Sequence, residues 1–360
     1  MNQLLMQLGI LGFPKAGKTT LFNTLTASHQ STDKFSSSAE TNIGVALVAD
    51  RRLEQLRDLF KPKRYVPATV QYVDIPGINK GESAESLDLA KLKTVDALVH
   101  VVRAFEDPEI LHPEGSVDPA RDVSTLDLEL ILADHDIVER RLERLEKATK
   151  RGLNPEEVRE RQILSEILLP ALESEKPLRE IELDPEDEKR LRGFQLLSAK
   201  PMLIVINADE TRAAEPPEAF GVQPRTAVRA VTVSAPIEQE ISALSPEEQK
   251  EFLADLGLSE PSLDRVTRAS YDLLGVISFF TVGEDEVRAW TIRRGTRARE
   301  AAGAIHSDIE RGFIRAEVVH CDDLIRLKTM AACKDAGVLR LEGKEYAVKD
   351  GDVVHFRFNV

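Results

Sequence analysis

Residues 12–19 read GFPKAGKT, and this octapeptide lies between an apolar run and the start of a helical pattern. The apolar run, residues 8–11, predicts a buried strand, and residues 19–25 predict a helix. Two glycines, a lysine and a threonine at this spacing are typical of a phosphate-binding loop, whose backbone N–H groups wrap a nucleoside triphosphate. A Cβ at Gly12 or Gly17 would obstruct the approach of the phosphates. The chain is therefore expected to hold a nucleotide at the N-terminus of its first helix.

The loop also predicts roles for individual side chains. Lys18 is expected to reach the β- and γ-phosphates as a catalytic residue, and the hydroxyl of Thr19 is expected to ligate Mg²⁺. The whole loop is expected to contact the nucleotide, through Phe13, Pro14, Lys15, Ala16, Gly17, Lys18, Thr19 and Thr20.

A second motif lies at the end of a predicted strand. Residues 69–74 alternate in hydrophobicity and lead into a D-x-x-G motif that runs from Asp74 to Gly77. Asp74 is expected to hold Mg²⁺ through water, and the Gly77 N–H to contact the γ-phosphate. The next residue is Ile78, where many GTPases place a glutamine that orients the attacking water. Isoleucine cannot do this, so either hydrolysis is slow or another group positions the water.

The base site is expected after a later apolar strand. The usual guanine signature is N-K-x-D, whose aspartate accepts hydrogen bonds from two guanine donors. Here the corresponding residues are Asn207, Ala208 and Glu210. Asn207 is expected to contact the purine N7, while the alanine and the longer glutamate weaken the case for guanine and allow adenine. Ser234 and Ala235 fit the final loop, where a backbone N–H contacts the base; a small-residue turn is the alternative.

Composition narrows the class of protein and its partners. No apolar run reaches transmembrane length and no signal-peptide pattern opens the chain, so a soluble cytoplasmic protein with no membrane partner is expected. The net charge of −14 argues against a protein coated with nucleic-acid-binding surface, and no DNA partner is expected. Cys321 and Cys333 form no metal-spaced cluster and fit a reducing compartment.

The negative charge is unevenly distributed. Residues 276–360 hold 14 acidic and 14 basic residues, so the acidic excess lies in the first 275 residues. Arginines crowd one segment of the neutral part: Arg288, Arg293, Arg294, Arg297 and Arg299. If the chain contacts RNA, this segment is the expected face, because phosphates attract it and the acidic remainder repels them. The alternative is a solvated loop and helix surface.

Strand and helix patterns alternate along much of the chain. This alternation predicts an α/β fold with a doubly wound sheet and ligands at the carboxyl ends of its strands. Short, continuous apolar strands are expected at residues 97–102, 202–206 and 231–233.

Two regions break the alternation. Residues 126–194 show no strand signal and are expected to form a helical, coiled-coil-like insertion, in which Asn154 and Asp184 each precede a proline and acidic residues, a helix-start signature. From residue 276 onward, short strands surround one helix near residues 298–310 and predict a small α+β domain.

Taken together, these motifs resemble the YchF-type P-loop NTPases of the Obg group, over nearly the whole chain. The resemblance rests on the phosphate loop, the D-x-x-G motif, the N-x-x-E motif, and HVVR, SAPIE, EVRAWTI, AGAIHSD and the terminal NV. The C-terminal segments among these are the most specific, and they imply that residues 276–360 form the family's ubiquitin-like TGS domain. The expected domains are thus a P-loop domain (residues 1–125 and 195–275), the helical insertion (126–194) and the TGS domain (276–360).

The resemblance also implies a function. The family is similar in having N-x-x-E, which goes with ATP use over GTP, and in replacing the glutamine with an apolar residue; its members are described as ATPases that bind ribosomes. Its proposed water-positioning histidine lies in a loop after the fourth strand, where His112 matches. A neutral imidazole can accept a hydrogen bond from water near pH 7. A solvent-exposed loop histidine is the alternative.

Two stretches depart from the family pattern. Family members read roughly FPFCTIEPN in switch I, whereas residues 35–42 read FSSSAETN, so Ser38 aligns with the Mg²⁺-ligating threonine and Thr41 is the other candidate. The loop after Gly77 reads KGESAE at residues 80–85, with fewer glycines and more acidic charge. These departures bear on turnover and partners more than on nucleotide binding.

We therefore expect a monomeric, Mg²⁺-dependent nucleoside triphosphatase that prefers ATP to GTP and acts as a molecular switch on the ribosome or ribosomal RNA. Two alternatives stay open. One is a GTPase of the Obg group. The other is a nucleotide-gated ribosome- or RNA-binding module with little hydrolysis, which Ile78 and the altered switches favour.

Overall fold

The computed structural model describes residues 6–27, 43–75, 89–149 and 152–359. The chain forms two compact units. The first unit contains Gln7–Gly44 and Tyr72–Val266; the second contains Met1–Met6, Val45–Gln71 and Thr267–Val360. Within the described ranges no helix is long and apolar enough to cross a membrane.

A six-stranded sheet forms the centre of the first unit. Its spatial strand order is β2-β4-β1-β5-β6-β7, and the pairings β1–β5, β5–β6 and β6–β7 are parallel. The chain crosses between the two units within β2 and within β4. The strands are β1 (Gln7–Leu11), β2 (Ile43–Leu47), β4 (Thr69–Asp74), β5 (Ala97–Ala104), β6 (Met202–Ala208) and β7 (Val228–Val233). Every residue of β5 and β6 is buried, as expected for central strands covered on both faces.

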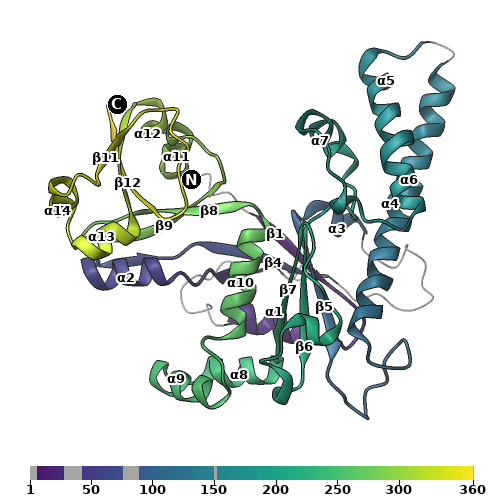
Figure 1. The fold of residues 1–360 in the computed structure, drawn as a ribbon, viewed down its shortest axis with the longest axis horizontal. Helices are drawn as coiled ribbons and strands as arrows, with labels where there is room; N and C mark the ends of the chain where they lie inside the picture. Colours follow the sequence, from purple (N-terminus) through teal and green to yellow (C-terminus); the bar gives the residue numbers. More distant parts are fainter. Residues whose placement is uncertain (1–5, 28–42, 76–88, 150–151, 360) are drawn as a thin grey trace. The chain divides into compact units, whose positions relative to one another are not determined.

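Helices alternate with these strands (Figure 1), and because β1, β5 and β6 are parallel neighbours, their carboxyl ends lie on the same side of the sheet. The expected doubly wound arrangement is confirmed. The helices outside the insertion are α1 (Lys18–Ala27), α3 (Leu89–Thr94), α8 (Ala235–Ala243) and α9 (Pro246–Asp255), with short 3₁₀ turns at Glu210–Arg212 and Pro217–Phe220. The chain passes from the first unit into the second within α10 (Ser262–Leu273).

The helical insertion is longer than the sequence pattern suggested. It begins with α4 (Pro119–Thr149), which starts before residue 126, and continues through α5 (Pro155–Gln162), a π-helical turn (Ile163–Leu168), α6 (Leu169–Glu173) and α7 (Pro185–Leu191), with 3₁₀ turns at Leu178–Glu180 and Arg192–Phe194. Asn154 caps α5 with a full capping box, and Asp184 caps α7, as their sequence signatures predicted. Helices α4, α5 and α6 pack together around a core of leucine, isoleucine and valine (Figure 1).

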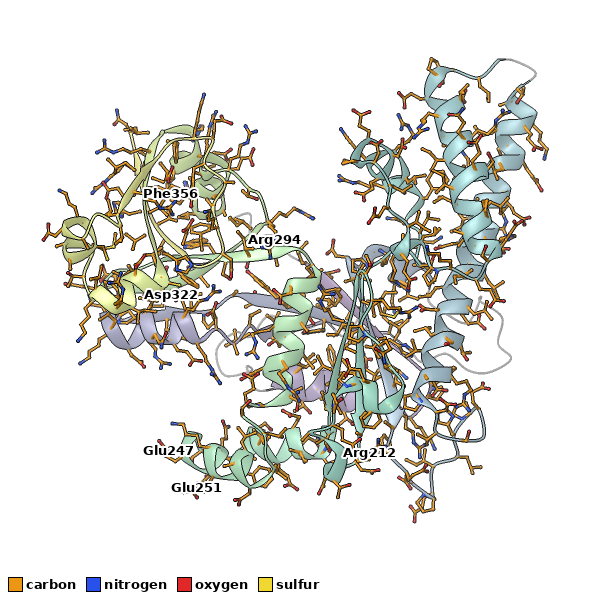
Figure 2. The ribbon with its side chains drawn as sticks, in the orientation of Figure 1. Arg212, Glu247, Glu251, Arg294, Asp322 and Phe356 are labelled. Atoms are coloured by element: carbon orange, nitrogen blue, oxygen red, sulfur yellow. The ribbon has the colours of Figure 1, made fainter. Side chains whose placement is uncertain are left out.

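The second unit contains its own six-stranded sheet, in the order β11-β10-β12-β8-β9-β3. The strands are β3 (Arg64–Val66), β8 (Val276–Thr281), β9 (Glu286–Arg293), β10 (Phe313–His320), β11 (Arg340–Glu342) and β12 (Asp352–Phe358). The helices are α2 (Arg51–Phe60), α11 (Ala298–Ile305), α12 (Ser307–Arg311), α13 (Cys321–Leu327) and α14 (Met330–Asp335). Phe356, labelled in Figure 2, belongs to the core between the sheet and α11.

The expectation of one helix near residues 298–310 is wrong. The helix breaks at His306, whose backbone is extended (φ −163°, ψ 143°) and whose side chain caps α12 by accepting from the Asp308 N–H. Periodicity alone does not distinguish one helix from two helices joined by a capping residue.

Residues 45–71 lie with the C-terminal part of the chain, not with the rest of residues 1–125. Strand β3 pairs with β9, and Arg52 on α2 donates to Asp350 at 2.7 Å. Leu53 and Leu56 of α2 are fully buried. The other domain boundaries expected from the sequence stay a prediction.

Candidate nucleotide-binding site

The loop between β1 and α1 has a backbone shape that only particular residues adopt. Gly12, Lys15 and Gly17 all have positive φ (144°, 60° and 98°). A Cβ on Gly12 would lie 2.3 Å from the Val101 carbonyl oxygen, and one on Gly17 would lie 2.3 Å from Asn207 Nδ2. Glycine is therefore required by protein atoms that fill the space behind the loop, in addition to the phosphate contact that the sequence suggested.

Lys18 lies at the start of α1 with its ammonium group drawn into the loop. Its Nζ donates to the Phe13 carbonyl oxygen at 2.7 Å, and the residue is buried. Burial lowers the pKa of Lys18 to about 8, against the opposing attraction of Asp74. A cation held in this way beside backbone N–H groups makes the loop a site for an anion.

Thr19 and Asp74 meet across the site. The Thr19 hydroxyl lies 3.3 Å from Asp74 Oδ2, although 55 residues separate them in the sequence. Asp74 is the last residue of β4, and Thr19 is in the first turn of α1. A hydroxyl and a carboxylate oxygen at this separation are the hard oxygen donors that Mg²⁺ takes. The other expected metal residue, Ser38, and Gly77 lie outside the described residues.

Asn207 ties two loops of the site together, a role that the sequence did not predict. Its Nδ2 donates to the Ala16 carbonyl oxygen at 3.1 Å, and its Oδ1 accepts from the Ala235 N–H at 3.1 Å. The side chain is buried at the end of β6. An amide nitrogen carries two protons, so Nδ2 keeps one for a base. The primary contacts of Asn207 are nevertheless with the protein, and they fix the distance between phosphate loop and base loop.

A pocket of about 860 Å³ opens beside these residues. Ten of the expected residues line it: Lys15, Gly17, Lys18, Thr19, Thr20, Asn207, Ala208, Glu210, Ser234 and Ala235. Phe13, Pro14 and Ala16 shape the loop behind it, and Asp74 lies at its Thr19 side. The sequence missed six lining residues: Phe105, Ile110, Asp209, Thr211, Pro236 and Gln239. Their position one to six residues after the ends of strands β5, β6 and β7 is the signal that could have found them.

The expected base end of the pocket is built from residues at the ends of two strands, β6 and β7. Ala208 is buried, and Glu210 is exposed in the 3₁₀ turn that ends at Arg212, which Figure 2 labels. The Ser234 hydroxyl is buried and has no hydrogen-bond partner within the described ranges of the chain. A buried hydroxyl without a partner costs free energy, so its presence in the pocket wall fits a ligand that supplies the missing partner.

His112 does not line the pocket. It lies in the loop between β5 and α4, where its Nε2 is 3.0 Å from Asp122 Oδ2 and its side chain is 4% exposed. Its Nδ1 accepts from the Glu114 N–H at 3.1 Å, so the ring proton is on Nε2. The ring packs edge-on against Phe13 of the phosphate loop, with 6.3 Å between centroids. The expected catalytic histidine is thus beside the loop but is not a lining residue of the pocket, and both its ring nitrogens contact protein groups.

Four of the five arginines between residues 288 and 299 are exposed, and one is buried. Arg293, Arg294, Arg297 and Arg299 are exposed. Arg294, labelled in Figure 2, follows β9 directly. Arg288 is buried, with its guanidinium carbon 4.1 Å from the Trp290 ring centroid. Arg288 therefore belongs to the interior of the second unit because a cation stacks favourably on an indole ring.

Comparison with known proteins identifies the family. A model described as "50S ribosome-binding GTPase" matches residues 7–132, and the model of the YchF GTPase C-terminal domain, described as a protein of unknown function, matches residues 276–359. The ribosome-binding ATPase YchF of Bacillus subtilis (strain 168) is 46% identical over 363 residues, which cover 98% of this chain and 99% of that protein. The chain belongs to the YchF family.

Other YchF proteins agree over the same length. The ribosome-binding ATPase YchF of Escherichia coli O157:H7 is 41% identical over 360 residues, covering 98% of this chain and 99% of that protein. The solved structure of the Schizosaccharomyces pombe YchF GTPase is 32% identical, covers 99% of this chain and 98% of its own, and superimposes with a TM-score of 0.86. The resemblance noted in the sequence and the expected fold class are confirmed.

Proposed function

We propose that this YchF family member is a Mg²⁺-dependent nucleoside triphosphatase that prefers ATP to GTP and acts as a ribosome-associated molecular switch. The observation that carries the proposal is one pocket lined by Lys18, Thr19 and the base-loop residues, with Asp74 hydrogen-bonded to Thr19 beside it. Hydrolysis is supported by the names of the relatives, which are ATPases. Their ribosome-binding names support the partner.

Each group of residues in the site has a distinct chemical role. The loop N–H groups and Lys18 bind and orient the triphosphate, and the cation offsets charge that develops on the phosphoryl oxygens. Thr19 and Asp74 would hold Mg²⁺, which neutralises phosphate charge when bound. Asn207 keeps the phosphate loop and the base loop in register. His112 is the proposed acceptor for the proton of the attacking water, in place of the glutamine that Ile78 replaces.

The preference for ATP rests on the base end of the pocket. Glu210 stands where a guanine-specific site has aspartate, and the buried Ala208 leaves no lysine to pack there. The names of the relatives include both activities, since the S. pombe protein is titled a GTPase. A direct comparison of nucleotides is therefore the most informative measurement, by isothermal titration with non-hydrolysable ATP and GTP analogues and Mg²⁺.

ATP should bind at least as tightly as GTP in that titration. The double variant Glu210→Asp with Ala208→Lys should move the preference toward GTP because it restores the guanine-specific residues. Glu218→Asp, which makes the same change at an exposed glutamate outside the pocket, serves as the control. A wild-type preference for GTP of about tenfold, roughly 1.4 kcal/mol, would reverse the assignment.

His112→Ala should lower kcat about 10- to 100-fold with little change in nucleotide affinity, because a proton acceptor acts in the transition state. Steady-state hydrolysis and nucleotide titration on the same preparation separate the two effects. His135→Ala, a partly exposed histidine on α4, controls for removal of an imidazole. An unchanged kcat in His112→Ala would make His112 a bystander.

The second candidate function is a nucleotide-gated ribosome-binding module with little hydrolysis. The inward position of His112 favours it, because both ring nitrogens are occupied by protein groups. In that case the free protein should bind ATP with full affinity while its kcat is no higher than that of His112→Ala.

A further inference from the structure

We propose that Asp122 is a positioning residue that holds His112 in an inward, resting position and so limits the rate at which the free protein hydrolyses nucleotide. The inference rests on the proposed catalytic role of His112. It concerns the loop between β5 and α4, residues 105–118, and the first turn of α4.

The resting position leaves His112 unable to accept a proton. The lone pair of Nδ1 is used by the Glu114 N–H, and Nε2 carries the proton that is donated to Asp122. An imidazole activates water only through a nitrogen lone pair that is free to accept. His112 must therefore leave Asp122 before it can act on a water molecule in the pocket.

Asp122 is itself firmly held. Its side chain is 2% exposed, and its Oδ1 accepts from Arg121 Nε at 3.1 Å and Nη2 at 2.8 Å. The same guanidinium donates to Ser116, to the carbonyl oxygen at 2.7 Å and to the hydroxyl at 3.0 Å. Arg121 thus bonds both the Asp122 carboxylate and Ser116 near the end of the loop. These bonds fix the position of the carboxylate that contacts His112.

The burial of neighbouring residues in this loop is the reverse of the usual preference. Leu111 is 89% exposed, whereas the side chain of His112 beside it is 4% exposed. Leucine ordinarily favours the interior and histidine is more often at the surface. An arrangement that turns Leu111 inward and His112 outward would recover apolar burial, which offsets the loss of the Asp122 contact. The exchange of these two adjacent side chains is the second state of the loop that the proposal requires.

The loop is also in direct reach of a bound nucleotide. Phe105 and Ile110 line the pocket, and Ile110 is two residues from His112. Arg103 connects these residues by donating to the carbonyl oxygens of Phe105 at 3.0 Å and Ile110 at 2.9 Å. A ligand that displaces Ile110 thereby acts on the segment that carries His112, and a ligand biases such an equilibrium only through contacts that differ between the two states.

The test is Asp122→Asn, in the full-length protein. Arg121 and the His112 ring donate to different oxygens of Asp122, and an amide replaces one of these oxygens by a donor, so one of the two contacts is lost. We expect kcat for ATP to rise about threefold or more while the Kd for ATP changes less than about twofold, since the released state is favoured before chemistry. Carbethoxylation of His112 by diethyl pyrocarbonate, followed by peptide mass spectrometry, should become faster.

Three further variants make the result specific. Combined with His112→Ala, the Asp122→Asn change should give no gain over His112→Ala alone. Arg121→Gln, at a partly exposed position, should give the same effects in smaller degree if Asp122→Asn folds poorly. Asp187→Asn removes another buried aspartate that accepts from arginines, in α7, and should leave kcat unchanged.

An unchanged carbethoxylation rate in both Asp122→Asn and Arg121→Gln would overturn the proposal, because the ring would not be held by Asp122. A fall in kcat would also overturn it, because Asp122 would then support the active orientation. Faster carbethoxylation with no change of kcat in Asp122→Asn or in His112→Ala would show a held ring without catalytic function. That result would refute the proposed role of His112 and the rate limit together.

Discussion

Replacing Lys18 with alanine is expected to abolish ATP hydrolysis and to weaken triphosphate binding by about 2–3 kcal/mol, or about 30- to 150-fold. The ammonium group is the buried cation of the loop, and its loss leaves triphosphate charge without its charge-assisted donor. Isothermal titration and steady-state hydrolysis measure the two effects. Thr19→Ala should also abolish hydrolysis, through loss of the metal ligand.

A matched control is available in the same unit. Lys200 is a partly buried lysine, whose Nζ donates to the Lys93 carbonyl oxygen, and burial lowers its pKa as it does for Lys18. Lys200 is not in the pocket. Lys200→Ala should leave ATP affinity unchanged. Full activity in Lys18→Ala would refute the assignment of the phosphate loop.

The titration of Lys18 adds a pH signature to this result. Because the pKa of Lys18 in the free protein is about 8 and a bound triphosphate raises it, binding takes up a proton above pH 8. Wild-type affinity should therefore fall as the pH rises above 8 and stay level below it. In Lys18→Ala this contribution to the pH dependence should be lost.

Reversing Arg293, Arg294 and Arg297 to glutamate is expected to abolish co-sedimentation with ribosomes at low salt. These side chains are exposed in the part of the chain that carries no net charge, where RNA phosphates meet no acidic excess. ATP hydrolysis by the free protein should stay nearly intact because the pocket is built entirely from first-unit residues. Wild-type binding should weaken as salt rises, as counterion release requires.

The control for this variant reverses three other exposed cations of the second unit. Arg311, Arg326 and Lys328 lie on or beside α12 and α13, and their reversal changes the net charge by the same amount. If both triple variants lose co-sedimentation with ribosomes equally, the total charge of the protein accounts for the loss. If the triple variant of Arg293, Arg294 and Arg297 co-sediments as well as wild type, the arginine segment is a solvated surface. Absence of wild-type binding at every salt concentration would remove the ribosome from the proposal.

Local signals predicted the parts of the site that lie within short stretches. The spacing of Gly12, Gly17 and Lys18 and the strand-end position of Asp74 define the phosphate side because each depends on neighbours in sequence. The helix caps at Asn154 and Asp184 are also local, and the structure has both.

Long-range contacts account for what the sequence did not predict. Asn207 contacts Ala16 and Ala235, which lie 191 and 28 residues away, so its loop-joining role has no local pattern. His112 contacts Asp122, which belongs to the next helix, and no local pattern predicts this contact. Arg288 did have a signal: it precedes Trp290 by two positions in a strand, which places both side chains on one face.

The route of the chain through the second unit has a further consequence. The covalent path from Thr19 to Asp74 passes through α2 and β3, which complete the C-terminal sheet and its helical cover. Cutting the chain after residue 275 would remove the partner strand of β3 and the packing over Leu53 and Leu56, while the segment that holds them would still connect Thr19 and Asp74, the expected metal ligands. The C-terminal region is thus needed to complete the packing of residues 45–71. A shortened chain would report on a damaged nucleotide site, so the C-terminal region is better studied by surface substitutions than by deletion.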